Sequence, residues 1–142
     1  MGTTFDHIGV TVSDIEKTSE FYIKYFGFEK DYEYRFDEEF FKKRHAQFRQ
    51  PAGVTCRVQM MRAPDGVLLA LFQFSNTEAG EACWPRTGYN HICLRVDGLP
   101  ALCERMVADG VEILMPPEIR TRKDGHWIYL KDPDGNFIEL WD

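Results

Sequence analysis

The chain has 142 residues, 44% of them hydrophobic, which is enough for one domain with a sizeable core. A formal net charge of −6 disfavours nucleic acid as a main partner, and no segment approaches the roughly 20 apolar residues of a membrane span. The N-terminus has no basic start followed by an apolar run, and the four cysteines form no C-x-x-C pair, so we expect a cytoplasmic domain with free thiols.

The first residues predict a strand followed by a helix. Residues 5–12 alternate between apolar and polar side chains, which is the period of a half-buried strand, and His7 lies on the less apolar face. Ser13-Asp14 then predicts the start of a helix, because Asp is a preferred N-cap residue, and Gly27 predicts its end.

Residues 36–48 form an insertion between strands expected at about 28–35 and about 54–61. Asp37 is placed to cap a short helix there, and the insertion carries three phenylalanines, Phe40, Phe41 and Phe48. Two interpretations are open. The insertion is either a packing element with a solvated charged face or a lid over a substrate cavity.

The second part of the chain repeats the first with an offset of 84 residues. Tyr89–Asp97 restates the pattern of Phe5–Ser13, and His91 occupies the place of His7. A helical pattern follows the second copy as it follows the first, and Asp109-Gly110 ends it. Such a repeat predicts a duplicated module in which both histidines face the same way. Two equivalent histidines that converge on one point suggest a metal ion.

Each copy ends in a hairpin with matching turn residues, Ala63-Pro64-Asp65-Gly66 and Asp132-Pro133-Asp134-Gly135, in which Gly takes a positive φ. In the strand after each turn one polar residue interrupts an apolar run, and we interpret Gln73 and Glu139 as repeat partners. Gln73 lies seven residues after its turn glycine and Glu139 only four, so the hairpins differ in length or one contains a bulge.

Four side chains therefore fall in the first and last strands of the two copies: His7, Gln73, His91 and Glu139. Two imidazoles, an amide oxygen and a carboxylate suit a divalent ion that keeps open positions for substrate. An isolated histidine in a strand is more often a satisfied core residue. The second histidine and a carboxylate on an apolar strand favour a metal site instead.

These motifs resemble the vicinal oxygen chelate superfamily, the glyoxalase, bleomycin-resistance and extradiol-dioxygenase group. The resemblance rests on the repeated histidine strand, on Phe21-Tyr22 to Phe26-Gly27-Phe28, and on residues 132–140. It implies an α+β fold of two tandem βαβββ modules that form a half-open eight-stranded barrel around a divalent metal ion. Within one domain, residues 1–142, the modules would be 1–75 and 89–142, joined by a linker at 76–88. The resemblance also implies a homodimer and a small-molecule substrate.

The family's metal ligands carry over to His7, Gln73, His91 and Glu139, a set similar to that of methylmalonyl-CoA epimerase. That enzyme's catalytic Glu, just before the third strand of its first module, has no match near Gln50-Pro51-Ala52-Gly53. Glyoxalase I generally has a glutathione-binding Arg four residues after the first ligand position, where this chain has Thr11. The resemblance therefore disfavours glutathione as a cosubstrate.

Strand alternation predicts the rest of the pocket. If Cys56, Val58 and Met60 pack in the core, Arg57 and Gln59 face the cavity. By the same rule Arg95 faces the cavity beside His91, and Trp127 and Tyr129 lie beside Glu139. An arginine there suits a carboxylate or phosphate group of the substrate. The alternative is that each arginine is a surface residue or pairs with a structural carboxylate.

The preferred hypothesis is a metal-dependent isomerase, epimerase or lyase that acts through an enediolate, with Ni, Co, Mn, Zn or Fe as the ion. Two candidates for the base are open, Glu139 and a carboxylate of the insertion at residues 36–48. A second hypothesis is an Fe(II) dioxygenase that uses His7, His91 and Glu139, with Gln73 unligated and Tyr129 as proton donor. A third is a metal-free protein that sequesters a flat aromatic compound. Binding-only relatives usually lack the metal ligands, so the full set favours an enzyme.

Overall fold

The computed structural model describes residues 2–80, 82–119 and 125–142. The chain forms two compact units, Met1–Ala79 and Gly80–Asp142, and the boundary between them falls within residues 76–88, the linker expected from the sequence. Each unit has the order βαβββ, so the expected α+β class and the duplicated module are both confirmed. None of the described helices is long and apolar enough to cross a membrane.

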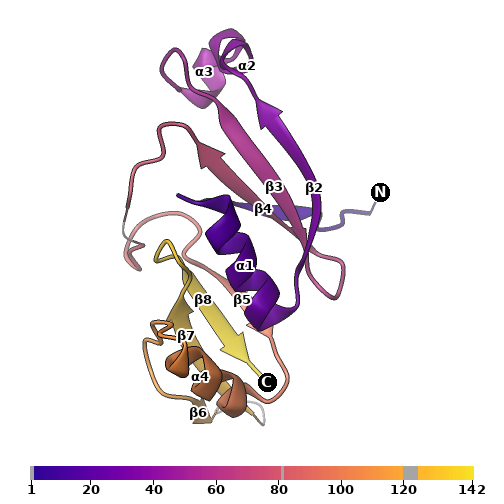
Figure 1. The fold of residues 1–142 in the computed structure, drawn as a ribbon, viewed down its shortest axis with the longest axis vertical. Coiled ribbons are helices and arrows are strands. Elements are labelled where there is room, and N and C mark those ends of the chain that lie inside the picture. Colours follow the sequence, from indigo (N-terminus) through magenta and orange to yellow (C-terminus); the bar gives the residue numbers. More distant parts are fainter. Residues whose placement is uncertain (1, 81, 120–124) are drawn as a thin grey trace. The chain divides into compact units, whose positions relative to one another are not determined.

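Unit one is a four-stranded sheet with one long helix on it (Figure 1). Its elements are β1 His7–Thr11, α1 Ile15–Phe26, β2 Glu29–Phe36, α2 Glu38–Lys43, α3 His45–Phe48, β3 Cys56–Arg62 and β4 Leu68–Phe74. The strand order is β1-β4-β3-β2, in which β1 runs parallel to β4 and the other neighbours are antiparallel. The first and last strands of the module therefore lie side by side.

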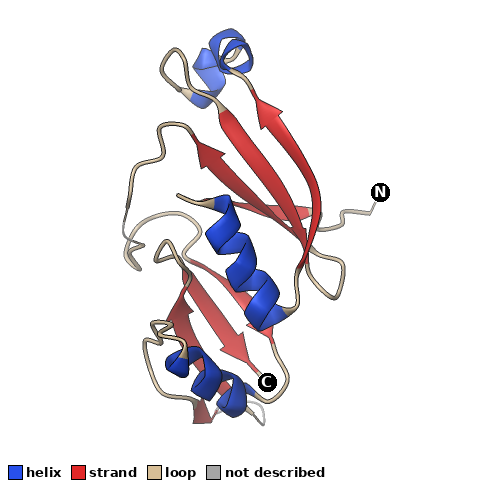
Figure 2. Cartoon of the chain, in the orientation of Figure 1, coloured by secondary structure: helices blue, strands red, loops and turns tan. Residues whose placement is uncertain are grey.

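Unit two has the same plan with shorter elements. They are β5 His91–Arg95, α4 Leu99–Ala108, β6 Glu118–Ile119, β7 His126–Lys131 and β8 Phe137–Trp141. The strand order β5-β8-β7-β6 repeats that of unit one, and β5 is again parallel to β8. Figure 2 shows one long helix against the strands of each unit.

Helix α1 begins and ends where the sequence predicts. The Asp14 side chain accepts a hydrogen bond from the backbone N–H of Lys17, which satisfies one of the free donors of the first turn. Gly27 ends the helix with φ of +67°, a left-handed conformation that costs glycine little. The predicted cap of the insertion is also confirmed, since Asp37 accepts from the N–H of Phe40.

The ladders assign every strand residue to a face. His7 is paired with Leu68, Gly9 with Ala70 and Thr11 with Phe72. Across β3 and β4, Ala70 is paired with Met60 and Phe72 with Val58, so these residues share the face of His7. The opposite face carries Met61, Leu69 and Leu71, which are at most 4% exposed. Helix α1 packs on that opposite face, because its first residues contact Gln73 and Arg57 there.

Unit two divides its faces in the same way. Ile128, Leu130, Ile138 and Leu140 are fully buried on the side of helix α4, whose Leu99 and Met106 are also fully buried. The other face of the sheet carries His91, Cys93, Arg95, Phe137, Glu139, Trp141, Trp127 and Tyr129. The alternation predicted for β7 and β8 is therefore confirmed.

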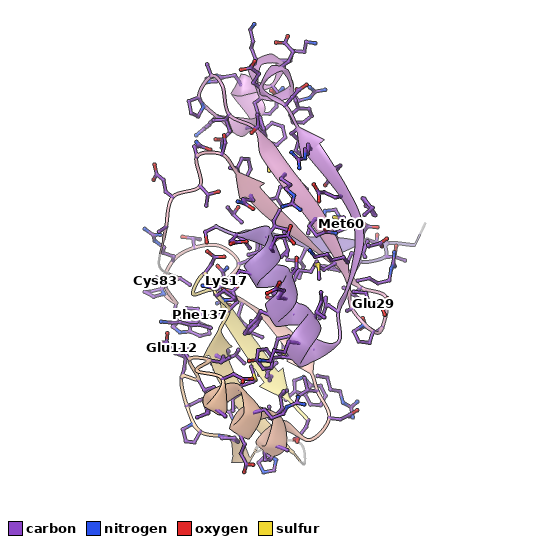
Figure 3. All side chains as sticks on the ribbon, in the orientation of Figure 1. Lys17, Glu29, Met60, Cys83, Glu112 and Phe137 are labelled. Carbon is purple, nitrogen blue, oxygen red and sulfur yellow. The ribbon has the colours of Figure 1, made fainter. Side chains whose placement is uncertain are left out.

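The insertion packs on the sheet of unit one. Phe41 is 2% exposed and belongs to a buried apolar cluster with Val54, Cys56, Val58, Met60 and Ala70. Its ring lies 5.9 Å from that of Phe74. Phe74 is the last residue of β4, six residues from Leu68, the partner of His7, whereas Ala70 of the same cluster is only two residues from Leu68. The insertion therefore packs on the face of the sheet that carries His7. Figure 3 labels Met60 on β3, in the middle of this sheet.

Candidate active site

The side chains of His91 and Glu139 meet on the face of the unit-two sheet opposite α4. Cys93 and Glu139 are register partners, which places the Glu139 carboxylate beside β5, the first strand of the module. Nε2 of His91 lies 3.1 Å from Oε2 of Glu139, and the two side chains are 25% and 18% exposed. This half-buried pair lies on strands, which hold side chains more rigidly than loops do.

Both histidines use Nδ1 in the same way. Nδ1 of His91 donates to Oδ1 of Asn90, and Nδ1 of His7 donates to Oδ2 of Asp6, each over 2.6 Å. A histidine whose Nδ1–H is bonded to a neighbouring oxygen presents Nε2 as the acceptor nitrogen, and metal-binding histidines typically have such a partner. The repeated residue pair therefore favours, in both histidines, the tautomer that leaves Nε2 able to bind a metal ion.

The geometry of the pair fits a divalent ion. Nε2 of His91 and Oε2 of Glu139 face each other at 3.1 Å, close enough to share one cation, whether a proton or a metal ion. Ligand atoms at about 2.1 Å from one ion and at right angles to each other are about 3.0 Å apart. Within the described residues, His, Cys, Asp and Glu side chains form no cluster of three or more.

Aromatic side chains surround the pair of His91 and Glu139. Tyr129 directs its hydroxyl to Oε2 of Glu139 at 3.4 Å, and its ring packs edge-on against His91 at 5.4 Å. Burial raises the pKa of the Tyr129 phenol, and the charge of Glu139 adds to the effect. Trp127 packs on Tyr129 at 5.5 Å. The prediction that Trp127 and Tyr129 lie on the face of Glu139 is confirmed by the ladder.

Trp84 is one of these aromatic side chains, and its place in the site was not predicted from the sequence. Its ring stacks on Phe137 at 4.4 Å and 12°, and contacts Tyr129 at 4.9 Å and His91 at 5.7 Å. Phe137 lies at the start of β8 (Figure 3). Trp84 belongs to a segment without periodicity, and the one available signal was a large aromatic residue in an otherwise polar linker.

Gln73 does not share the face of His7. Register places it on the opposite face of β4, where Oε1 accepts a hydrogen bond of 3.0 Å from the backbone N–H of Ile15. Asp142 does the same in unit two, because Oδ2 accepts from the N–H of Leu99 over 2.9 Å. Ile15 and Leu99 are the first residues of α1 and α4. Gln73 is therefore the counterpart of Asp142, a helix-capping residue, and its pairing with Glu139 was wrong.

The residue of unit one that corresponds to Glu139 is Ala70. Gly9 and Ala70 are paired in β1 and β4 as Cys93 and Glu139 are paired in β5 and β8. Ala70 also lies four residues after its turn glycine, as Glu139 does, which removes the apparent difference between the hairpins. The methyl group of Ala70 has no metal-binding atom, so of these two repeat positions in unit one only that of His7 carries a ligand atom.

Arg57 and Gln59 were also expected on the face of His7, and this was wrong. Arg57 lies on the α1 face and forms ion pairs with Glu16 at 2.6 Å and Glu33 at 2.8 Å. These carboxylates raise the pKa of Arg57 above its usual range. Gln59 is 4% exposed, and its amide donates to the backbone carbonyls of Tyr32 and Met60. Arg57 and Gln73 do line a cavity of about 520 Å³, but it lies at the end of the sheet away from His7 and its partner Leu68.

Arg95 lies on the face of His91 and Glu139, as expected. Its guanidinium carbon stands 5.0 Å from the centre of the Trp141 ring, which is its register partner on β8. This contact is a cation–π interaction.

Comparison with known proteins gives one consistent result. The family described as Glyoxalase/Bleomycin resistance protein/Dioxygenase superfamily matches residues 4–140. A lactoylglutathione lyase from Pseudomonas putida is 30% identical over 149 residues, which cover 96% of this chain and 83% of that enzyme. Two solved structures share the fold. A glyoxylase/bleomycin resistance protein/dioxygenase domain from Frankia sp. EAN1pec has a TM-score of 0.75 at 16% identity and covers 99% of this chain and 98% of its own. A mutant of the fosfomycin resistance protein FosX from Listeria monocytogenes, complexed with Mn(II) and 1S,2S-dihydroxypropylphosphonic acid, has a TM-score of 0.67 at 24% identity and covers 99% and 92%.

Proposed function

Because the chain belongs to the glyoxalase/bleomycin resistance protein/dioxygenase superfamily, we propose that it is a metal-dependent lyase or isomerase whose small substrate chelates the ion through neighbouring oxygens. The observation that carries this proposal is the pair of His91 and Glu139, with Nε2 directed at the carboxylate. We propose His7, His91 and Glu139 as the protein ligands. Two imidazoles and one carboxylate leave several positions open for substrate on a divalent ion.

When bound, the divalent ion would polarise the substrate carbonyl and stabilise negative charge on its oxygens. The side chains around it have separate roles. Asn90 and Asp6 hold the two imidazoles in the tautomer that exposes Nε2. Tyr129 directs its hydroxyl to Oε2 of Glu139, and we propose that it donates a proton to the substrate there. Glu139 is the carboxylate nearest the proposed reaction centre, and we propose that it also accepts the substrate's α-proton, which generates an enediolate.

Thr11 supports a substrate other than a glutathione adduct. It stands on the His7 face of β1, paired with Phe72, where an arginine would be needed to bind glutathione by the family's pattern. We therefore propose a cosubstrate-independent reaction, although the Pseudomonas putida relative is by name a lactoylglutathione lyase. We also propose that the enzyme is a homodimer. A reducing, cytoplasmic location is supported by the four cysteines, none of which forms a disulfide in the part of the chain that the structure describes.

Metal analysis of protein purified without chelators tests the site. Wild type is expected to carry a divalent ion in stoichiometric amount, and His91→Ala and Glu139→Gln to lose most of it. Gln73→Ala is the matched control, because it removes a polar side chain of the α1 face and should keep the metal. Undiminished metal in His91→Ala, or equal depletion in Gln73→Ala, would contradict the proposed ligands. Assays with methylglyoxal, with and without glutathione, then test whether the thiol is needed.

A second function is favoured by Ala70. A site with two histidines, one carboxylate and no fourth protein ligand is also the facial triad of non-haem Fe(II) oxygenases. The same His7, His91 and Glu139 would then hold Fe(II), with Tyr129 as proton donor. Oxygen uptake by the Fe(II)-loaded protein in the presence of catechols separates this function from the lyase or isomerase, which consumes no oxygen.

A further inference from the structure

We infer that Arg95 anchors an anionic group of the substrate, so that the substrate is a small organic anion carrying its charge about one ring-width from its two chelating oxygens. This inference rests on the proposed metal site and names the class of molecule that the site takes. On the face of the unit-two sheet opposite α4, three cross-strand rows follow one another along β5, β8 and β7.

The rows differ in chemistry. The first contains His91 and Phe137, the second Cys93, Glu139 and Tyr129, and the third Arg95, Trp141 and Trp127. Successive rows on one face are about 7 Å apart, because residues two apart along a strand rise by that distance. A six-membered ring held by its oxygens beside Glu139 therefore reaches the row of Arg95 with a substituent on its far side.

Arg95 is available for an anion. The arginines of the unit-one strands all form ion pairs. Arg35 pairs with Glu33, Arg57 with both Glu16 and Glu33, and Arg62 with Asp31. Lys131, on the same face as Arg95, pairs with Glu112 at 3.0 Å. Among the residues that the structure describes, no carboxylate pairs with Arg95. This guanidinium lies two rows from the candidate ligand His91, in a chain with a net charge of −6.

The guanidinium is also held in place. Trp141 lies beneath it, and Trp127 is the register partner of Trp141, so the row offers a flat apolar surface that ends in a positive charge. A stacked guanidinium keeps its N–H edge free to bind both oxygens of a carboxylate or phosphonate. The corresponding row of unit one has Thr11 and Phe72 instead, so this charge belongs to one module only.

The test uses two matched probes, 3,4-dihydroxybenzoate and 3,4-dihydroxybenzamide, which have the same vicinal oxygens and nearly the same shape but differ in charge. Titration calorimetry on Zn(II)-loaded protein is expected to show roughly ten- to hundredfold tighter binding of the benzoate. Arg95→Gln should remove that preference and leave the affinity for the benzamide unchanged, while Arg95→Lys should keep part of it. Arg105→Gln, an exposed arginine of α4, is the control and should behave as wild type.

Equal binding of the two probes by wild type, or a preference that survives in Arg95→Gln, would overturn the role of Arg95. Titration of the metal-free protein tests the metal site separately. If both probes bind without Zn(II) as tightly as with it, the proposed chelation is wrong. The ratio of the two affinities still tests the role of Arg95.

Discussion

Gln73 and Asp142 accept the same hydrogen bond in the two modules, from the first backbone N–H of α1 and of α4. An amide does this in one module and a carboxylate in the other. The side-chain oxygen in each case satisfies a helix N-terminal donor that has no partner within the helix. The two residues perform one structural task with different chemistry, and only one of them can be titrated.

The first prediction follows from that difference. Hydrogen bonds from the backbone N–H groups of His126 and Leu99 hold the pKa of Asp142 below its usual range. A carboxylate with a depressed pKa in the folded state stabilises the fold above its unfolded pKa, near 4, and the stabilisation is lost as pH falls through the folded value. Hydrogen exchange should show the Leu99 amide losing protection below about pH 4, with the Ile15 amide keeping more.

The matched variants are Asp142→Asn and Gln73→Glu. Asp142→Asn should remove the acid loss at Leu99, and Gln73→Glu should introduce one at Ile15. Unchanged pH profiles in both variants would show that these side chains do not cap the helices in solution.

The second prediction concerns Ala70. Its Cβ is fully buried on the face of His7, so a carboxylate there would be costly without a metal ion and useful with one. Ala70→Glu should lower the melting temperature of the metal-free protein and increase the rise in melting temperature on adding Zn(II) or Mn(II). Ala70→Gln controls for volume and should show the first effect with a smaller second one. A metal-dependent rise no larger than that of wild type would mean that Ala70 is not the fourth ligand position.

The third prediction concerns the insertion, residues 36–48. Phe41 is 2% exposed within the apolar cluster of unit one, whereas Phe48 is 45% exposed. Phe41→Ala should therefore destabilise the protein by about 3–5 kcal/mol, and Phe48→Ala by much less. Denaturant unfolding measures both, and metal content should stay at the wild-type level in each. The expectation of a lid requires the reverse for Phe41, namely nearly unchanged stability and impaired ligand retention.

The fourth prediction uses Trp84 as a reporter. Its ring is 5.7 Å from that of His91, so a paramagnetic ion bound there should quench its fluorescence. Addition of Co(II) is expected to reduce the emission of wild type, and Trp84→Phe should lose the largest part of that change while it keeps the metal. If Trp127→Phe or Trp141→Phe loses more of the signal than Trp84→Phe does, the ion binds elsewhere on this face.

The sequence predicted the modules and most element boundaries because those depend on local chemistry. Asp14, Asp37, Gly27 and the repeated histidine strand each act through residues a few positions away. The phase of β3 and β4 could not be predicted in the same way. Met60 and Met61 are adjacent and both fully buried, so the alternation that identifies a half-exposed strand is absent. Only the pairing of β1 with β4 determines which face belongs to His7.

The error at Gln73 has a related cause. A polar residue in an apolar strand suggests a functional role. Gln73 has a structural one instead, because it accepts a hydrogen bond from Ile15 at the start of α1, 58 residues away in the sequence. Ala70, which occupies the ligand position, carries no chemical signal at all. Trp84 was missed because its contacts come from the fold of a segment without periodicity.

The placement of caps and ligands on opposite faces has a consequence for how such a duplicated chain can diverge. Ala70 and Gln73 lie three residues apart on β4 but on opposite faces, one toward His7 and the other toward α1. A substitution of Ala70 can add a metal ligand without changing the hydrogen bond that holds α1 on the sheet. A substitution of Gln73 changes that hydrogen bond and leaves the metal ligands as they are. After duplication, one copy can therefore drift in chemistry while natural selection continues to maintain its architecture through separate residues.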